Sequence, residues 1–257
     1  MRLLGISPWE VPDRTDEKVD LEYDKDKYAE LLTLYEETGL SPTIESIRQV
    51  EFGVGSVCAS FWGDLALTTT AEAQQRYNEL LYETMRQEIE QSTTVVELGC
   101  GYGYNLWMLK RHFPYRHFLG GELSSNAVEL AAKLSIEVSQ FNFYDSFYKL
   151  IEDAQSPITV FTSHAIEQLP KSESFFRGLL PHRDKIQTVF HFEPMYELYD
   201  STLLGLMRQR YTEVNDYNRD LLSELQQRDI QIVRTEANVF GMNPLNPTSI
   251  VQWEYRI

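Results

Sequence analysis

The chain has 257 residues, of which 42% are hydrophobic and 12% aromatic, so it has enough apolar material to bury a sizeable core. This composition excludes disorder throughout the chain. The formal net charge is −16, and residues 1–90 contribute −11 of it. Because so negative a chain repels phosphate groups, we expect neither nucleic acid nor an anionic membrane surface as its partner.

The cysteines and the lack of long apolar segments indicate the compartment. The chain has two cysteines, Cys58 and Cys100, and no structural disulfide is expected between them. The apolar run at the N-terminus is too short for a signal peptide, and no window approaches the length of a membrane span. We therefore expect a soluble, cytoplasmic protein.

The N-terminal third is predicted to be mainly helical. Residues 1–22 mix prolines with charges and are interpreted as an irregular arm. Apolar residues at helical spacing predict one amphipathic helix around Leu31 and another from Thr70 to Ile89. Between them, residues 52–63 are apolar and rich in small residues, which favours a buried loop or short helix over a ligand contact. Because amphipathic helices bury their apolar faces, we expect a cover over the rest of the protein or a homodimer contact.

A strand, a glycine turn and a helix follow directly. Residues 95–98 are of strand type and include Glu97, and the helix-forming run 104–110 begins just after the turn. The turn contains Gly99, Cys100, Gly101 and Gly103. Glycine has no Cβ and adopts backbone angles closed to other residues, so a ligand can approach the backbone closely at such a turn. We therefore predict that a ligand binds there.

Two further strands end in polar residues. The strand 116–122 ends in Glu122, about 20 residues beyond the glycines, where a carboxylate can accept hydrogen bonds from ribose hydroxyls. The strand 136–140 leads into a segment that contains Asn142. In an open α/β sheet, ligands lie beyond the carboxyl ends of the strands, so these residues are expected at the same site.

The spacing Glu-x-Gly-x-Gly-x-Gly from Glu97 to Gly103, followed by Glu122, resembles motif I and the ribose-binding acid of the class I S-adenosylmethionine-dependent methyltransferases. The resemblance implies an α/β fold: a Rossmann-like, doubly wound, seven-stranded and mostly parallel sheet with an antiparallel last strand, plus a helical N-terminal extension. It divides the chain into an extension of residues 1–90 and a cofactor-binding methyltransferase domain of residues 91–257.

The resemblance also implies that S-adenosyl-L-methionine is the cofactor. Asn142 takes the position of the acid or amide that contacts adenine in the family, with Asp145 as the second choice. Arg76 is assigned to the aminoacid end of the cofactor, because Arg pairs well with a carboxylate, or else it is a solvated helix residue. The residues expected to bind the cofactor are Glu97, Gly99, Cys100, Gly101, Gly103, Glu122, Leu123, Asn142, Phe143, Thr162, Arg76 and Tyr77.

A fourth strand, residues 157–162, precedes a segment that resembles motif IV of the family. The segment reads Ser163-His164-Ala165-Ile166-Glu167-Gln168-Leu169-Pro170. Many family members have His-x-x-Glu-His-Leu-Pro in this place, where the segment lines the reaction site; here Gln168 replaces the second histidine. The fifth strand, residues 185–193, ends in Glu193.

The C-terminal part is predicted to contain helices and a final pair of strands. Residues 201–228 form a long helical stretch, with a break expected near Asn215. The strands 230–235 and 250–255 follow, and the resemblance makes them an antiparallel hairpin at one edge of the sheet. Neither a Cys-x-x-Cys nor a His-Glu-x-x-His spacing occurs, so we expect no metal site.

The residues expected to act on a methyl acceptor lie near the carboxyl ends of the fourth and fifth strands: His164, Glu167, His191 and Glu193, with Glu197 beside them. Paired carboxylates bind a cationic group and help to remove its proton, so the first hypothesis is a small-molecule methyltransferase acting on an amine or guanidino nitrogen. The alternatives are a hydroxyl acceptor such as a sugar, with a histidine as base, and a methyltransferase-like protein that binds without turnover. His191 is equally expected to be a core histidine, and Glu197 a solvated helix residue.

Overall fold

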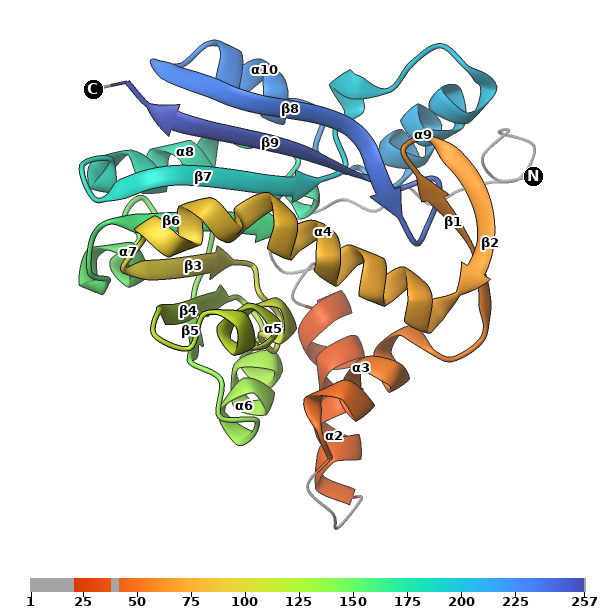
Figure 1. The fold of residues 1–257 in the computed structure, drawn as a ribbon, viewed down its shortest axis with the longest axis horizontal. Coiled ribbons are helices and arrows are strands. Elements are labelled where there is room, and N and C mark those ends of the chain that lie inside the picture. Colours follow the sequence, from red (N-terminus) through yellow and green to blue (C-terminus); the bar gives the residue numbers. More distant parts are fainter. Residues whose placement is uncertain (1–20, 38–41, 257) are drawn as a thin grey trace.

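The computed structural model describes residues 21–37 and 42–256, which form one mixed sheet with helices on both faces (Figure 1). The strands are β1 Ser56–Phe61, β2 Asp64–Thr69, β3 Thr94–Leu98, β4 His117–Glu122, β5 Val138–Gln140, β6 Ile158–Ser163, β7 Ile186–Glu193, β8 Ile230–Gly241 and β9 Thr248–Tyr255. They lie in the order β2-β1-β8-β9-β7-β6-β3-β4-β5. Most of the irregular arm predicted for residues 1–22 lies outside the described residues.

The helices alternate with the strands over most of the chain. The longer ones are η1 Leu21–Tyr28, α2 Ala29–Glu37, α3 Ile44–Phe52, α4 Thr70–Gln91, α5 Tyr104–His112, α6 Ser125–Lys133, α7 Lys149–Asp153, α8 Glu173–Leu179, α9 Leu203–Val214 and α10 Leu221–Gln226. The part of the chain that the structure describes also has short 3₁₀ turns, η2 Ile166–Gln168, η3 Leu180–His182 and η4 Tyr196–Leu198. The break expected near Asn215 is confirmed, because this residue caps the end of α9.

The central strands are parallel and the C-terminal strand runs against them. β3 pairs in parallel with β4 and β6, β4 with β5, and β6 with β7. β9 is antiparallel to both β7 and β8, as predicted for the last strand. The predicted number of seven strands was wrong, because β1 and β2 extend the sheet beyond β8 to nine strands in residues 21–37 and 42–256. The C-terminal hairpin therefore lies inside the sheet and not at its edge.

The two additional strands form a hairpin in the segment predicted as a buried loop or short helix. Trp62 and Gly63 have φ of 51° and 89°, so both lie in the left-handed region that a tight two-residue hairpin turn requires. Leu65 and Leu67 on β2 are 55% and 81% exposed. The small and apolar residues of this segment thus belong to a sheet edge, where apolar composition does not imply burial.

Alternate residues of the central strands point to opposite faces of the sheet, and a different set of helices covers each face. Val95 packs with residues of α4, α5 and α6, whereas Val96 packs with residues of α7, α8 and α10. This division into two cores confirms the doubly wound α/β architecture, since each central strand is buried on both sides. Figure 1 shows α4 lying across the front of the sheet.

The N-terminal helices pack against the face that α4 covers. The helix predicted around Leu31 is present as α2, which continues the π-helix η1, whereas α3 was not predicted. α4 begins with a capping box, in which the side chains of Thr69 and Glu72 each accept the backbone N–H of the other. The N-terminal region is therefore helical, as predicted, except for the β1–β2 hairpin.

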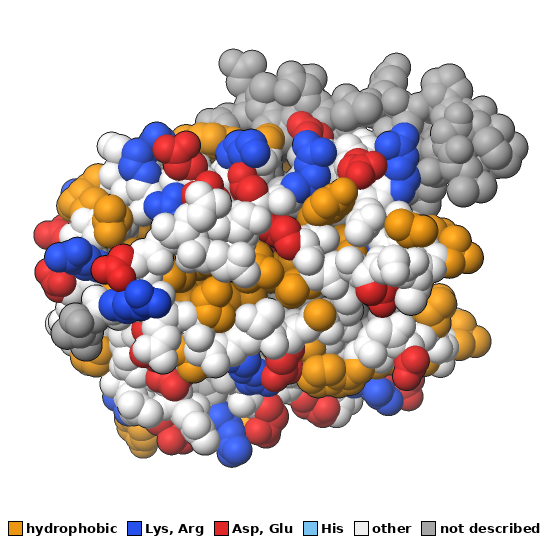
Figure 2. Space-filling model, turned by 90° about the horizontal axis from the view of Figure 1, so that it is seen from above, with side chains coloured by type: hydrophobic (Ala, Val, Ile, Leu, Met, Phe, Trp, Pro, Cys, Tyr) orange, Lys and Arg blue, Asp and Glu red, His pale blue; other side chains and the backbone are white. Residues whose placement is uncertain are grey.

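The charges of the described residues are mixed on the surface. Figure 2 shows acidic and basic side chains interspersed over one face of the molecule, with hydrophobic side chains between them. Among the described residues, no helix is both long enough and apolar enough to cross a membrane.

The packing of α4 on the sheet leads to a first prediction. Leu81 is fully buried in the core beneath this helix, so Leu81→Ala should lower the free energy of unfolding by about 2–5 kcal/mol. Urea denaturation followed by circular dichroism measures the change. Gln87→Ala, at an exposed position of the same helix, is the control and should change it by less than about 0.5 kcal/mol. Equal effects of the two substitutions would contradict the packing.

Candidate functional site

The turn after β3 forms one wall of the site. Gly99, Gly101 and Gly103 have φ of 75°, 55° and 82°, which side chains disfavour. A Cβ on Gly99 would lie 2.4 Å from the Cβ of Ala165, and one on Gly101 would lie 2.5 Å from the hydroxyl oxygen of Tyr28. Both glycines are therefore required by the close approach of other parts of the chain.

Glu122, the last residue of β4, is tied to this turn. Its Oε2 accepts a hydrogen bond from the Gly101 N–H at 2.8 Å, and its Oε1 accepts one from the Ser124 N–H at 2.9 Å. Burial raises the pKa of the carboxyl group, while these two hydrogen bonds oppose the rise. Since each carboxylate oxygen can accept a second bond, Glu122 can still receive hydroxyl groups of a ligand.

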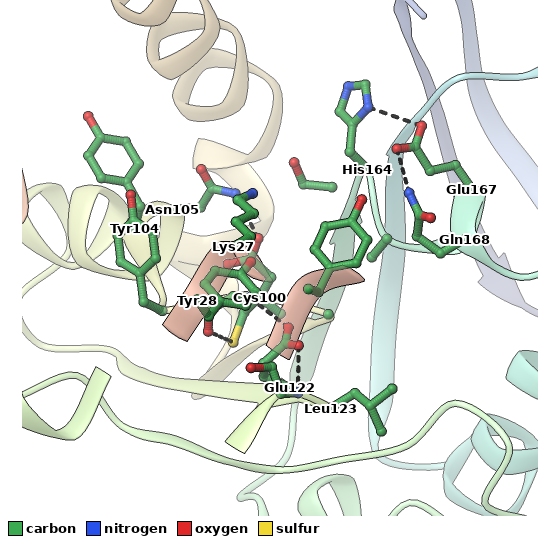
Figure 3. Close-up of a pocket in the computed structure, with 18 of the residues that line it drawn as sticks. Lys27, Tyr28, Cys100, Tyr104, Asn105, Glu122, Leu123, His164, Glu167 and Gln168 are labelled. Carbon is green, nitrogen blue, oxygen red and sulfur yellow. Dashed lines mark hydrogen bonds and ion pairs between the residues drawn. The ribbon is translucent and has the colours of Figure 1, made fainter. Parts of the chain in front are cut away.

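A cavity of about 540 Å³ opens beside the turn (Figure 3). The glycine turn, residues that follow β4, β5 and β6, residues of η1, α3 and α4, and the loop between β8 and β9 line it. Figure 3 shows Glu122 and Leu123 toward one end, and His164, Glu167 and Gln168 toward the other. A cavity of this size is typical of small-molecule sites.

Most of the residues predicted to bind a cofactor line this cavity. They are Tyr77, Glu97, Gly99, Cys100, Gly101, Glu122, Leu123, Asn142 and Phe143. The Tyr77 hydroxyl lies 2.5 Å from Oγ of Ser163 at the end of β6. The Asn142 Oδ1 accepts the backbone N–H of Tyr144, which fixes the side chain beside the cavity.

Four residues considered for the cofactor lie outside the cavity wall: Arg76, Gly103, Asp145 and Thr162. Arg76 is exposed, and its guanidinium stacks on Phe61 at 4.5 Å from the ring centroid. Gly103 faces Ile136, because a Cβ there would lie 2.6 Å from Cγ2 of that residue. Asp145, the second choice for adenine, is exposed and also outside the wall. On α4, Tyr77 points to the cavity and Arg76 does not, since adjacent helix residues face different directions.

The cavity wall contains buried polar atoms without a hydrogen-bond partner among the described residues. They are Arg48 Nε, Gln74 Nε2, Glu97 Oε2, Asn105 Oδ1 and Asn246 Oδ1. Two of these atoms are donors and three are acceptors. Buried polar groups are normally paired, because an unpaired one costs free energy. The set therefore indicates a ligand that carries both donors and acceptors.

Arg48 reaches the cavity from α3. Its guanidinium lies between two rings, 4.2 Å from the centroid of Phe52 and 4.3 Å from that of Tyr104. Its Nη1 pairs with Oε2 of Glu51 at 3.1 Å, and Lys27 pairs with the other oxygen at 2.7 Å. These contacts fix the guanidinium and leave Nε available to a ligand.

Glu97 is a buried acid, with 1% of its surface exposed. Burial raises its pKa to about 8, although the hydrogen bond from Asn105 Nδ2, at 2.7 Å, and the charge of Arg48 lower it. The carboxyl group is therefore mostly protonated at neutral pH, and a cation beside Oε2 would favour its ionised form.

The π-helix η1 closes the cavity on the side of the glycine turn. Asp24 accepts hydrogen bonds from Oγ of Ser124 at 2.6 Å and from the N–H of Asn126 at 2.8 Å, at the start of α6. These bonds hold η1 so that Tyr28 lies against Gly101. Residues of η1 thus form part of the cavity wall.

A cluster around Glu167 occupies the other end of the cavity. The Oε2 of Glu167 lies 3.3 Å from Nδ1 of His164 and accepts a hydrogen bond from Nδ2 of Asn246 at 2.8 Å. Its Oε1 accepts one from Nε2 of Gln168 at 3.0 Å, and Nε2 of His164 lies 2.7 Å from Oγ1 of Thr248. Burial lowers the pKa of His164, but the charge and hydrogen bond of Glu167 raise it above its ordinary value.

His191 and Thr162 do not reach the cavity. Both are fully buried, and they hydrogen-bond to each other across β6 and β7 at 2.9 Å. The indole N–H of Trp253 donates to Nε2 of His191 at 3.0 Å. Burial lowers the pKa of His191 to about 3, so the ring is neutral. His191 is therefore the core histidine that the sequence left as an alternative.

Glu193 and Glu197 also lie outside the cavity wall. Glu193 is fully buried, and its Oε1 accepts the backbone N–H groups of Ala165 and Ile166. Glu197 accepts the backbone N–H of Ser223 at 3.0 Å. Of the five acceptor residues considered from the sequence, the structure brings only His164 and Glu167 together at the cavity.

Comparison with solved structures identifies the fold of this chain. No family model and no curated protein matches the sequence. The structure resembles that of magnesium protoporphyrin IX methyltransferase from Synechocystis PCC 6803 with bound S-adenosylhomocysteine, with a TM-score of 0.57 and 11% identity over 94% of this chain and 100% of that one. The chain has the class I methyltransferase fold.

Two more methyltransferase structures share this fold. The plantazolicin methyltransferase BpumL has a TM-score of 0.51 and 11% identity over 93% of this chain and 95% of that one. The geranyl diphosphate C-methyltransferase of Streptomyces coelicolor A3(2) has a TM-score of 0.50 and 10% identity over 71% of this chain and 80% of that one. Both were crystallised with S-adenosylhomocysteine.

Several residues of the cavity wall were not predicted from the sequence, although the methyltransferase fold was. The most important are Lys27, Tyr28, Arg48, Gln74, Asn105 and Asn246. Most lie in the N-terminal helices or in the β8–β9 loop, where no local motif marks them. Asn105 alone had a usable signal, because it lies in the first turn of the helix that follows the glycines.

The raised pKa of Glu97 leads to a second prediction. Its pKa rises from 4.5 to about 8, so the folded protein binds this proton more tightly than the unfolded chain does. The stabilisation is fully present below about pH 4.5 and is lost as the pH rises through about 8. Glu97→Gln should therefore reduce the loss of thermal stability between about pH 5 and pH 9. Calorimetry at both pH values tests this, with Glu83→Gln as an exposed control; an unchanged pH dependence would contradict it.

Proposed function

We propose that the protein is an S-adenosylmethionine-dependent methyltransferase that acts on a small molecule. The observation that carries the proposal is the set of unpartnered polar atoms beside a glycine turn in the class I methyltransferase fold. Their chemistry fits an α-amino acid. Arg48 Nε and Gln74 Nε2 are donors for a carboxylate, and Glu97 Oε2 and Asn105 Oδ1 are acceptors for an ammonium group.

The remaining parts of the cofactor also find suitable residues. Glu122 can accept the hydroxyls of a ribose, since its two oxygens keep free lone pairs. Asn142 and Phe143 follow β5 and line the same cavity, so they are the candidates for contact with adenine. When bound, S-adenosylmethionine supplies an electrophilic methyl group on its sulfonium.

The chain itself must hold the acceptor and remove its proton. His164 faces Glu167, whose carboxylate can accept a hydrogen bond from the Nδ1–H group of the ring. This bond would fix the ring so that Nε2 is the basic nitrogen. A base paired in this way can take a proton from an O–H or N–H group. In the cavity as it stands, Nε2 faces Oγ1 of Thr248, so the acceptor would have to replace that contact.

The geometry supports a hydroxyl acceptor ahead of the cationic nitrogen of the first hypothesis. That hypothesis rested on Glu167, Glu193 and Glu197 lying in one cleft. Of these three, only Glu167 lines the cavity, and both its oxygens already accept hydrogen bonds. A neutral acceptor needs no free carboxylate. The Oδ1 of Asn246 can accept a hydrogen bond from another O–H or N–H group of the same acceptor molecule. An amine or guanidino nitrogen remains the alternative. The structural neighbours do not decide between them, because their names refer to dissimilar compounds.

Calorimetry tests the cofactor. The protein should bind both S-adenosylmethionine and S-adenosylhomocysteine, and Gly101→Val should weaken both at least about tenfold by displacing Tyr28 into the cavity. Gly63→Val is the matched control, because Gly63 also has a positive φ but has no atom within 4 Å of a Cβ. If the folded wild-type protein binds neither S-adenosylmethionine nor S-adenosylhomocysteine, the proposed function is overturned.

A screen of sugars and other hydroxyl compounds, amines and guanidines for methyl transfer tests the acceptor. For a hydroxyl acceptor, His164→Gln should lower kcat by about 10²- to 10⁴-fold and leave cofactor affinity unchanged. For a cationic acceptor, Glu167→Gln should weaken acceptor binding by about ten- to a hundredfold through the loss of charge-assisted bonds. His117→Gln, at an exposed histidine paired with Glu137, is the control. Turnover of amines alone would refute the preference for a hydroxyl.

A further inference from the structure

A chain of buried hydrogen bonds crosses the sheet behind the cavity. Trp253 on β9 donates to Nε2 of His191 on β7, and Nδ1 of His191 lies 2.9 Å from Oγ1 of Thr162 on β6. Thr162 in turn bonds to the carboxyl group of Glu193 at the end of β7. All four residues are fully buried, and none of them lines the cavity.

The chemistry of the four groups fixes the direction of the chain. An indole N–H can only donate, so Nε2 of His191 is the acceptor and the proton of the neutral ring lies on Nδ1. His191 therefore donates to Thr162, whose own O–H is left to donate to Glu193. Each group donates a hydrogen bond to the next, and the carboxyl group of Glu193, whose pKa burial raises to about 7, is the terminal acceptor.

Glu193 connects this chain of hydrogen bonds to the loop that follows β6. Its Oε1 accepts the N–H groups of Ala165 and Ile166 at 3.0 and 3.1 Å, and its Oε2 accepts that of Glu167 at 3.3 Å. The N–H of His164 is held by the carbonyl oxygen of Phe192 at 3.0 Å. The carboxylate thus binds three consecutive amides from inside the protein.

The loop needs such support because of its backbone conformation. His164 has a φ of 53°, a left-handed value that residues other than glycine adopt at a cost and only where their surroundings impose it. The same conformation brings its ring to Glu167, at the edge of the cavity. The buried chain therefore stabilises a strained position that faces the site.

We propose that Trp253, His191, Thr162 and Glu193 form a positioning relay that holds His164 and Glu167 in the geometry needed for proton removal from the acceptor. The proposal rests on the proposed function for the reaction itself. It gives Glu193 a role through the loop, in place of the direct contact with the acceptor expected from the sequence.

The relay also contributes to the electrostatics around His164. The charges of three groups act on the pKa of this imidazole: Glu167 on its own loop, Glu193 from β7 and Arg48 from α3. The two carboxylates favour the charged ring and Arg48 disfavours it. Removal of the charge at Glu193 should therefore lower the pKa of His164, whereas a role confined to the stability of the fold would leave it unchanged.

Two nearly isosteric variants test the relay. Thr162→Val removes the hydroxyl link and keeps the volume, and Glu193→Gln removes the charge and part of the acceptor capacity. Each should lower kcat about ten- to a hundredfold, with cofactor affinity and acceptor KM nearly unchanged, because only the position of His164 is affected. Glu197→Gln, a change of the same type outside the cavity and the relay, should leave kcat at the wild-type value.

Measurements on the free protein separate this proposal from the proposed function. NMR titration of the His164 imidazole should give a lower pKa in Glu193→Gln, and the amides of Ala165, Ile166 and Glu167 should exchange faster in both variants. Folded variants with wild-type kcat, His164 pKa and amide exchange would overturn the relay. If the wild-type protein binds no S-adenosylmethionine, the proposed function fails, but the titration and exchange still decide whether the relay holds the loop.

Discussion

The hydrogen bond from the Gly101 N–H to Glu122 is the contact on which the site depends. It joins the turn after β3 to the end of β4, so the two strand ends meet at a fixed distance. The bond requires a backbone that only glycine adopts readily, and it satisfies one oxygen of a buried carboxylate. This connection places Gly101, which Tyr28 contacts, and Glu122, the proposed ribose contact, in the same part of the cavity wall.

The charges at the cavity partly balance one another, although the chain as a whole is strongly acidic. Lys27 and Arg48 both pair with Glu51, and Glu97 is kept mostly protonated by its burial. Buried charges persist only when they are paired or neutralised, so the net charge of the chain says little about a site that is shielded from solvent. This balance is the physical reason why an acidic composition does not by itself imply a cationic acceptor.

The N-terminal extension contributes to both the sheet and the site. β1 and β2 lengthen the sheet beyond β8, while η1, α3 and α4 form part of the cavity wall. The π-helical form of η1 is itself unusual, and π-helical turns are often found at functional sites. Asp24 anchors η1 to the start of α6, so this part of the N-terminal region is tied directly to the segment that follows β4. The boundary at residue 90 remains a prediction.

The sequence alone determined the features that depend on neighbouring residues. The glycine turn, the acid at the end of β4 and the helix α4 follow from local spacing, and the segment that holds His164 and Glu167 was assigned from its resemblance to motif IV. Only the tertiary structure decided which distant side chains meet: Arg48 and not Arg76 lines the cavity, and Asn246 reaches Glu167 from 79 positions away. It also turned Glu193 inward, because three buried amides needed an acceptor that no pattern in the sequence reveals.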